Sequence, residues 1–257
     1  MADSYAELAS GFQKLNAHYL ANSFPVKANE PLMMDVGCGT GFVAAELLEK
    51  YECAQITALD PSREMLAEAR ALITSSRCTF TCSSLMSYET SKTYDAIFSN
   101  AALHWLYPDY DAAFARLGAL LRTGGALRIA TAGETSESVL FDADMTAIFR
   151  SADLAEERIP FSDRRLTPEE AADLAEKAGF EIEDCFSIGR SRLMPVETYA
   201  RWLVASGGPW RHDDTDPERM VERLTSGLLQ LGSSMQVGHW TTVLVARKQR
   251  LPDPDFR

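Results

Sequence analysis

A glycine-rich segment preceded by a carboxylate is the first place where this sequence could do chemistry. Gly37, Gly39 and Gly41 occupy alternate positions, and Asp35 comes two residues before the first of them. Glycines allow the backbone to approach a ligand closely. A dinucleotide-binding loop has its third glycine one residue later, and a carboxylate beside a pyrophosphate would be unfavourable electrostatically. We therefore expect a ligand that is positively charged near this loop.

Asp60 is the second candidate ligand-binding carboxylate. It follows the short apolar run at residues 55–59, which is a predicted buried strand. A carboxylate in this place can accept hydrogen bonds from both hydroxyls of a ribose. Together with Asp35, it favours a nucleoside that carries a cationic tail.

The elements that must position these residues alternate between strand and helix. Apolar runs predict strands at residues 32–36, 55–59, 78–82, 94–100 and 126–131, the last of them after a turn at Gly124-Gly125. Helical spacing of apolar residues predicts helices at 42–51, 63–72 and 112–121, and an N-terminal helix that ends before Pro25. This alternation indicates a mostly parallel sheet with helices on both faces, and such sheets bind ligands at the carboxyl ends of their strands. The site should lie near Gly37, Asp60, Ser83 and Asn100.

After Gly133 the alternation stops. Residues 134–166 read as a helical, lid-like insertion, and Thr167-Pro168-Glu169-Glu170 then opens a capped helix. Two further strands are predicted at 181–188 and 240–246, with helices at 196–206 and 217–231 between them. This half of the chain contains six arginines of interest: Arg150, Arg158, Arg164, Arg165, Arg190 and Arg192. They either form a solvated face, or at least one of them pairs bidentately with a substrate carboxylate.

Composition limits the classes of function. The chain has 257 residues, of which 46% are hydrophobic and 24% charged, with 25 Lys and Arg against 37 Asp and Glu and a net charge of −12. This balance is typical of a globular protein, and the acidic charge disfavours nucleic acid and anionic membrane surfaces as partners. No stretch is long and apolar enough to span a membrane, we expect no signal peptide, and the five cysteines read as free thiols. We expect a cytoplasmic protein without a metal site.

Three ordered motifs resemble those of class I S-adenosylmethionine-dependent methyltransferases. They are Asp35-Val36-Gly37-Cys38-Gly39-Thr40-Gly41, Leu59-Asp60-Pro61-Ser62 with Met65-Leu66, and Tyr94-Asp95-Ala96-Ile97-Phe98-Ser99-Asn100. The resemblance implies an α/β Rossmann-like fold with a seven-stranded, mostly parallel sheet and an antiparallel last strand. It also implies one methyltransferase domain over residues 1–257. We divide this domain into an N-terminal helical cap (1–30), a cofactor-binding core (31–133), the lid-like insertion (134–166) and a C-terminal part (167–257).

The same resemblance implies that the cofactor is S-adenosyl-L-methionine and that its product is S-adenosyl-L-homocysteine. The glycine loop would hold the methionine part, Asp60 the ribose, and Asn100 with Ala101 would lie under the sulfonium. Many relatives have an acidic residue after the third strand that accepts from the adenine amino group. Here a serine or a backbone group must replace it. The full set of expected cofactor residues is Asp35, Gly37, Cys38, Gly39, Gly41, Asp60, Pro61, Met65, Ser84, Leu85, Asn100 and Ala101.

The segment Asn100 to Leu106, the N-terminal segment Tyr5 to Gln13 and the closing strand resemble the subgroup of malonyl carrier-protein O-methyltransferases and trans-aconitate methyltransferases. This implies methylation of a carboxylate of a small organic acid. A carboxylate is already ionised at neutral pH, so the enzyme needs donors that orient it rather than a base. The candidates are Gln13, His104 and Trp105, with Tyr5 as part of a gate over the cofactor. Packing is the alternative role for each of them.

Other readings remain open at the level of sequence. Methylation of carbon, nitrogen or a hydroxyl would require a catalytic base, for which His104 is the candidate. A carrier-protein substrate is possible, but carriers are typically acidic and this chain would repel one unless arginines form a basic patch. A nucleoside-binding scaffold and an NAD-linked oxidoreductase are the alternatives from other classes. A monomer and a homodimer are both compatible with the sequence.

Overall fold

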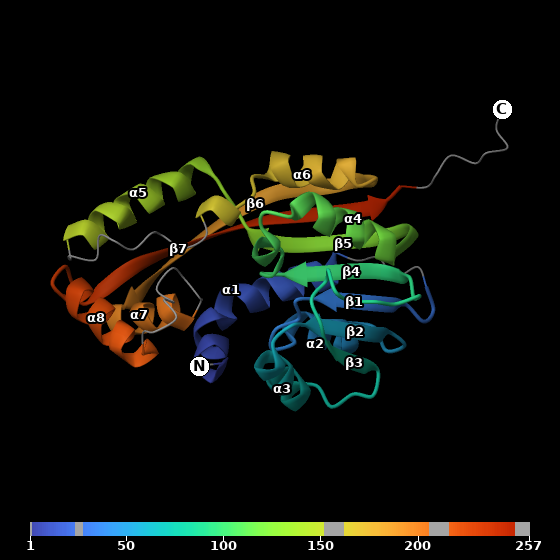
Figure 1. The fold of residues 1–257 in the computed structure, drawn as a ribbon, viewed down its shortest axis with the longest axis horizontal. Coiled ribbons are helices and arrows are strands. Elements are labelled where there is room, and N and C mark those ends of the chain that lie inside the picture. Colours follow the sequence, from blue (N-terminus) through green and yellow to red (C-terminus); the bar gives the residue numbers. More distant parts are fainter. Residues whose placement is uncertain (1, 24–27, 152–161, 206–215, 250–257) are drawn as a thin grey trace.

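The computed structural model describes residues 2–23, 28–151, 162–205 and 216–249. A seven-stranded sheet with the strand order β3-β2-β1-β4-β5-β7-β6 runs through the molecule (Figure 1). Its strands are β1 (Leu32–Val36), β2 (Gln55–Asp60), β3 (Cys78–Cys82), β4 (Tyr94–Asn100), β5 (Leu121–Ala132), β6 (Phe180–Pro195) and β7 (Ser234–Lys248). The helices are α1 (Ala2–Asn22), α2 (Phe42–Lys50), α3 (Arg63–Leu72), α4 (Tyr110–Leu120), α5 (Ser136–Ser151), α6 (Pro168–Lys177), α7 (Val196–Ala205) and α8 (Pro217–Leu229), with short 3₁₀ helices η1 (Leu103–Leu106) and η2 (Ser162–Arg164).

The direction of the strands confirms the predicted Rossmann-like class. Strands β1 to β5 pair in parallel with one another, whereas β7 is antiparallel to both β5 and β6. Several predicted boundaries agree with the structure to the residue, including those of α3, β3 and β4. The chain therefore presents the carboxyl ends of β1, β2 and β4 at one edge, as the alternation of elements predicts.

Capping explains where two of the helices begin. The hydroxyl of Ser62 accepts the backbone N–H of Met65 at 3.2 Å, which starts α3. Thr167 and Glu170 form a reciprocal capping box at the start of α6, and Pro168 occupies its first turn. Both caps satisfy N–H groups that a helix leaves without partners.

The expected turn at Gly124-Gly125 was wrong, because β5 continues through it. Tyr94 pairs with Leu121, whereas Ala96 pairs with Ala126, so residues 122–125 bulge out opposite a single residue of β4. The bulge lets one strand contain a segment that reads locally as a turn.

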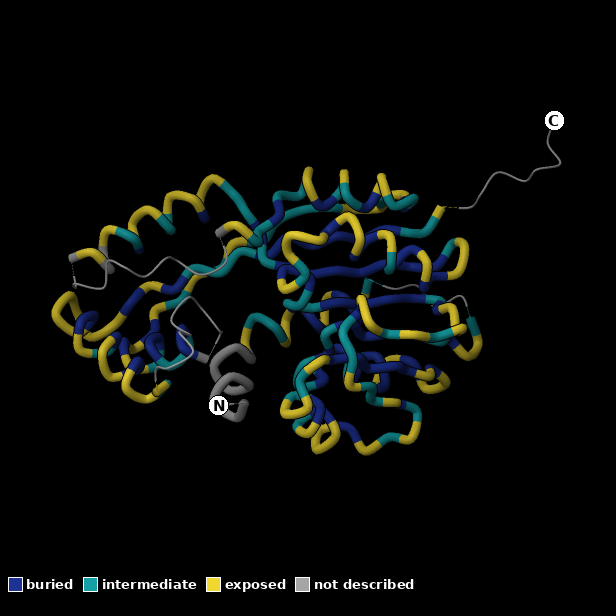
Figure 2. The backbone as a smooth tube through the Cα atoms, viewed as in Figure 1, coloured by how far each residue is buried: buried dark blue, intermediate teal, exposed yellow. Residues whose placement is uncertain are grey.

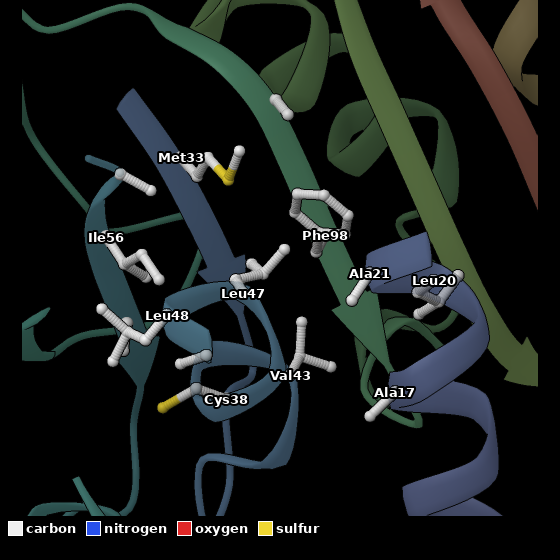
Figure 3. Packing of buried hydrophobic residues seen from close by; sticks show 14 of the residues in the cluster. Ala17, Leu20, Ala21, Met33, Cys38, Val43, Leu47, Leu48, Ile56 and Phe98 are labelled. Carbon is white, nitrogen blue, oxygen red and sulfur yellow. The ribbon is translucent and has the colours of Figure 1, made fainter. Parts of the chain in front are cut away.

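Two hydrophobic clusters cover the two faces of the sheet. On one face, residues of α1, α2 and α3 pack against β1, β2 and β4. Figure 3 shows Ala17, Leu20 and Ala21 of α1 on the same side of the sheet as Val43 and Phe98. On the other face, α4 and α6 pack against the sheet, with Phe114 and Ala175 fully buried. The second half of α1 therefore belongs to the core of the protein.

The hairpin of β6 and β7 is longer than the sequence indicates and leads away from the rest of the sheet. Its two strands pair from Phe180 with Lys248 to Pro195 with Ser234, but β5 accompanies β7 only at residues 241–247. We call its distal half, residues 189–195 and 234–240, the arm. Helices α5, α7 and α8 gather around the arm (Figure 1), where a third buried cluster includes Met194, Tyr199 and Leu224.

The arm and these helices form a second lobe with its own buried centre, visible as dark blue segments far from the main sheet in Figure 2. Within its described residues, the lid-like insertion contributes Met145 of α5 to this buried cluster, which the C-terminal helices α7 and α8 complete. The spacing of apolar residues predicts α7 and α8, but it does not indicate that these helices pack against the arm. Within the described residues, no helix has the length and apolar character needed to cross a membrane.

Candidate active site

The glycine loop follows β1 and has backbone angles that favour glycine. Gly37, Gly39 and Gly41 all have positive φ, of 66°, 52° and 91°. A Cβ on Gly37 would lie 2.2 Å from the Cβ of Ala102, whereas a Cβ on Gly39 would meet nothing within 4 Å. The first glycine is therefore required by packing against the segment after β4. The second leaves open space above the loop, where a ligand can approach the backbone.

Asp60, at the end of β2, holds the glycine loop by a hydrogen bond. Its carboxylate accepts the backbone N–H of Gly39 at 2.9 Å and that of Ser62 at 2.8 Å. Burial raises the pKa of Asp60, and the two N–H groups oppose that effect. Each carboxylate oxygen retains a further acceptor position, since an oxygen of this kind can accept two hydrogen bonds.

Asp35 is buried beneath the loop with half of its carboxylate unused. Oδ2 accepts the backbone N–H of Ala44 at 3.1 Å, while Oδ1 is buried and has no hydrogen-bond partner among the described residues. Burial, with a smaller effect from the nearby charge of Asp60, raises the pKa of Asp35 to about 7. Two acidic groups in a desolvated place are stabilised by a cation, so the donor set fits the positively charged ligand that the sequence predicts.

The end of β4 supplies a second unused buried acceptor. Asn100 Nδ2 donates to the carbonyl of Gln13 at 2.9 Å, whereas its Oδ1 is buried without a described partner. Ala101 has φ 55°, which is uncommon for alanine, and its N–H donates to the carbonyl of Ala130 at 2.7 Å. The structure thus joins Gln13 of α1 to the strand end that carries Asn100.

On the side of β2 and β3, the expected adenine residues lie beside a small network of serines. Ser84 and Ser87 exchange hydrogen bonds through their hydroxyls at 2.8 Å, and Ser83 reaches Ser87 at 3.0 Å. Leu85 is 3% exposed, and its side chain belongs to the core cluster that also contains Leu59 and Tyr94. Pro61 is exposed and Met65 is half-buried, close to the cap of α3.

Cys38 is part of the hydrophobic core rather than of the open side of the loop. Its N–H donates to the carbonyl of Leu59, and burial raises the pKa of its thiol. All five cysteines are free, and the described residues contain no cluster of three or more groups that could hold a metal ion.

His104 lies in η1, immediately after β4, and is buried. Its Nδ1 is 3.5 Å from the hydroxyl of Thr131 on β5. Burial lowers the pKa of His104 to about 3, and the charges of His239 and Arg164 act in the same direction. The imidazole is therefore neutral at physiological pH, and it is a poor proton acceptor.

Trp105 stands at the surface with 49% of its area exposed. The guanidinium of Arg164 lies 5.3 Å from the centre of the indole ring, in a cation–π contact. The side chain of Tyr5, the remaining expected substrate residue, lies outside the described part of the structure.

The structure also brings together residues of the arm and α1 that the sequence did not single out as a group. The ring of His239 stacks on Phe12 with 5.5 Å between centroids, and Arg192 lies over the same phenyl ring at 5.2 Å. Burial lowers the pKa of His239 to about 4, followed by the charges of Arg190, Arg165 and Arg192. His239 pairs with Arg190 across the hairpin. The predicted strands ended at residue 188 and began at residue 240, so they did not include this pair. Longer strands would have placed Arg190 and His239 opposite each other on one face.

Comparisons with known proteins agree with this arrangement. A family model described as a methyltransferase domain matches residues 33–125. Trans-aconitate 2-methyltransferase of Shigella flexneri serotype 5b is 30% identical over 199 residues, which cover 75% of this chain and 74% of the relative. The chain belongs to the class I S-adenosylmethionine-dependent methyltransferases.

Solved structures of other proteins share the fold of this chain. Phosphoethanolamine N-methyltransferase 2 of Haemonchus contortus, in complex with S-adenosyl-L-methionine, has a TM-score of 0.59 and 19% identity, and the match covers 97% of this chain and 57% of that one. The YcgJ protein from Bacillus subtilis has a TM-score of 0.61 and 15% identity, over 93% and 99% of the two chains. This methyltransferase uses S-adenosylmethionine as cofactor. The unused oxygen of Asp35 and the open backbone at Gly39 fit such a cationic nucleoside.

Proposed function

We propose that this methyltransferase transfers a methyl group to a carboxylate oxygen of a small organic acid. The observation that carries the proposal is the charge of the surroundings of His104 and His239. The positive charge of Arg164 acts on the neutral imidazole of His104, and the charges of Arg190, Arg165 and Arg192 act on that of His239, in a protein whose net charge is −12. A local excess of cations in an acidic protein favours an anionic acceptor.

The proposed reaction needs little from acid–base chemistry. Bound S-adenosylmethionine supplies an electrophilic methyl group on a sulfonium. A carboxylate is ionised at neutral pH, so the protein has to hold one of its oxygens near that methyl group and exclude water. A neutral His104 is suited to donate an N–H to the other oxygen, because it orients the nucleophile without neutralising it.

The roles of the cofactor residues form part of the same proposal. Asp60 binds the ribose hydroxyls through its remaining acceptor positions, and Asp35 stabilises the positive charge of the methionine part. Asn100 and Ala101 lie under the sulfonium, with Asn100 also holding α1 by its bond to Gln13. Met65 and Pro61 flank the adenine. Ser84 and the backbone of Leu85 contact its edge.

The relatives support a free acid as the acceptor. Several curated relatives at 28–30% identity are trans-aconitate 2-methyltransferases, including that of Escherichia coli strain K12 / DH10B. We propose a small molecule rather than a carrier-bound acyl group, because an acidic carrier would be repelled by the net charge of −12.

The proposal is tested by the alkali lability of the product. The purified protein is incubated with methyl-labelled S-adenosylmethionine and a panel of small organic acids, trans-aconitate first, and the product is then treated with mild alkali. A methyl ester releases labelled methanol, which is collected as the volatile fraction. A label that stays in a base-stable product would refute carboxylate methylation. It would instead favour a carbon, nitrogen or ether-oxygen product, for which His104 is a weak base because of its low pKa.

A further inference from the structure

Arg164 lowers the pKa of His104, and Arg190, Arg165 and Arg192 lower that of His239. The four arginines have different partners of their own. Arg165 donates from Nη1 and Nη2 to the two carboxylate oxygens of Asp142, at 2.6 and 3.1 Å. This bidentate pair uses the fork of Arg165 and balances its charge. Arg164 and Arg192 have aromatic rings beneath them, those of Trp105 and Phe12.

Arg190 differs from all of these because its partner is a neutral amide. Its Nη1 donates to Oδ1 of Asn16 at 2.9 Å. It forms no ion pair with a carboxylate in the described ranges, and burial lowers its pKa. A partly desolvated guanidinium without a counter-ion is costly for a protein, and an anionic ligand would relieve that cost.

The amide that holds Arg190 is itself held in place. Asn16 is 3% exposed, and its Nδ2 donates to the hydroxyl of Thr241 on β7 at 3.4 Å. Asn16 lies between Phe12, which contacts Arg192, and Tyr19, which contacts Phe186. Helix α1 therefore contacts β6 with three successive side chains. The middle contact, between Asn16 and Arg190, orients the guanidinium of Arg190.

The place of Arg190 relative to Gln13 indicates which part of an acceptor it meets. Gln13, joined to Asn100, and Asn16, joined to Arg190, are about one turn apart on α1. The strand end at Asn100 belongs to the cofactor side of the site, whereas Arg190 belongs to the arm. An acceptor whose nucleophilic oxygen lies near Asn100 would thus extend toward Arg190 with its other end.

We propose that Arg190 is a specificity-determining residue that binds an anionic group of the acceptor other than the oxygen that is methylated, and that Asn16 is its positioning residue. The inference rests on the proposed function, since it assumes an anionic acceptor. The acceptor then bridges the two lobes. The reacting oxygen of the acceptor lies near the neutral donor His104. Its second anionic group binds Arg190, whose positive charge is not balanced by its neutral partner Asn16.

The test measures binding of the acid directly, apart from catalysis. Calorimetric titration of the S-adenosylhomocysteine-bound protein with trans-aconitate, and with glutarate as a simple dianion, is compared among the wild type, Arg190→Met, Arg190→Lys and Asn16→Ala. Arg201→Met is the matched control, because Arg201 lies on α7 and pairs at the surface with Glu197 and Glu218. Arg190→Met is expected to weaken acid binding about 10- to 100-fold. Arg190→Lys is expected to have an intermediate effect, because lysine keeps the charge but not the planar fork.

Asn16→Ala should raise KM for the acid and change kcat little, because it misdirects Arg190 without removing it. All variants should keep the wild-type affinity for S-adenosylhomocysteine. At one fixed concentration, trans-aconitate should raise the Tm of Arg190→Met less than it raises the Tm of the wild type and of Arg201→Met, since ligand stabilisation falls as the Kd rises.

Equal acid affinity in the wild type and Arg190→Met would overturn the inference, as would failure of both acids to bind the wild type. Neither result is the same as failure of the proposed function, which is read from the alkali lability of the methylated product. If Arg190→Met loses affinity for S-adenosylhomocysteine as well, its effect is on folding of the site, and specificity is not the role of Arg190.

Discussion

The carboxylate of Asp60 and the backbone N–H of Gly39 are 2.9 Å apart and joined by a hydrogen bond. This contact connects the end of β2 to the loop after β1, so the carboxylate proposed to bind the ribose and the loop proposed to hold the methionine part form one unit. A second bond, from the N–H of Ser62, ties the same carboxylate to the start of α3. Changes at Asp60 should therefore affect both the ligand and the loop.

We expect Asp60→Ala to weaken binding of S-adenosylmethionine by about 1–3 kcal/mol, because charge-assisted hydrogen bonds to the ribose are lost. The measurement is calorimetric titration. Asp95→Ala is the matched control, since Asp95 sits at the amino end of β4, where it accepts the N–H of Leu32 and pairs with Arg122. Unchanged affinity in Asp60→Ala would remove this residue from the ribose site.

The glycines of the loop should respond differently to alanine. Gly37→Ala places a Cβ 2.2 Å from that of Ala102 and also forces a positive φ, so we expect a loss of about 2–5 kcal/mol in the free energy of unfolding. Gly39→Ala meets no neighbour and should lose only about 1–2 kcal/mol. Cofactor affinity should nevertheless fall in Gly39→Ala, because the added methyl group projects into the open space. Urea unfolding and titration with S-adenosylmethionine distinguish the two effects, and equal stability of the two variants would contradict the packing argument.

The affinity for S-adenosylmethionine should depend on pH through Asp35. Its pKa of about 7 means that the carboxylate becomes ionised between pH 6 and 8, and a cation binds more strongly to the ionised form. We expect affinity about tenfold weaker at pH 6 than on the plateau above pH 8. Asp35→Asn should remove this dependence. A wild-type affinity that is constant over this range would show that Asp35 does not face the charge of the cofactor.

The raised pKa of Asp35 has the opposite effect on the stability of the ligand-free protein, which should fall as pH rises. In the unfolded chain Asp35 releases its proton near its ordinary value of 3.8, whereas in the folded protein it retains the proton until about pH 7. The unfolded state therefore binds fewer protons in this interval, and the contribution of Asp35 to the free energy of unfolding falls as pH rises from about 4 to 7. Asp35→Asn should flatten that part of the stability profile measured by urea unfolding.

His104 should act as a hydrogen-bond donor rather than as a base. Its pKa of about 3 keeps it neutral from pH 5 to 9, so at saturating S-adenosylmethionine the pH profile of kcat should show no inflection from this residue. His104→Gln retains an N–H donor and should keep most of the activity, whereas His104→Leu should lose about 10- to 100-fold in kcat/KM. An inflection near pH 6.5 that disappears in His104→Gln would instead assign His104 the role of a base.

Local sequence signals by themselves determined the fold class and placed the expected cofactor residues at one edge of the sheet. Asp35, the glycine loop, Asp60 and Asn100 each lie at the end of a short strand, and strand ends of a parallel sheet meet at one edge whatever the details of packing. Ser62 and Thr167 mark their helix starts through contacts within four residues. Short-range patterns of this kind carry the information needed to place such residues.

Tertiary structure decided the acceptor side. The contacts of His239 with Phe12 and of Arg190 with Asn16 join residues from opposite ends of the chain, and they exist only because the β6–β7 hairpin extends beyond the sheet and α1 returns along it. The low pKa of His104 likewise comes from burial and from charges on other elements. Desolvation and the pairing of distant charges depend on the assembled fold, so the spacing of residues in the sequence could not reveal which arginine keeps its charge available for a ligand.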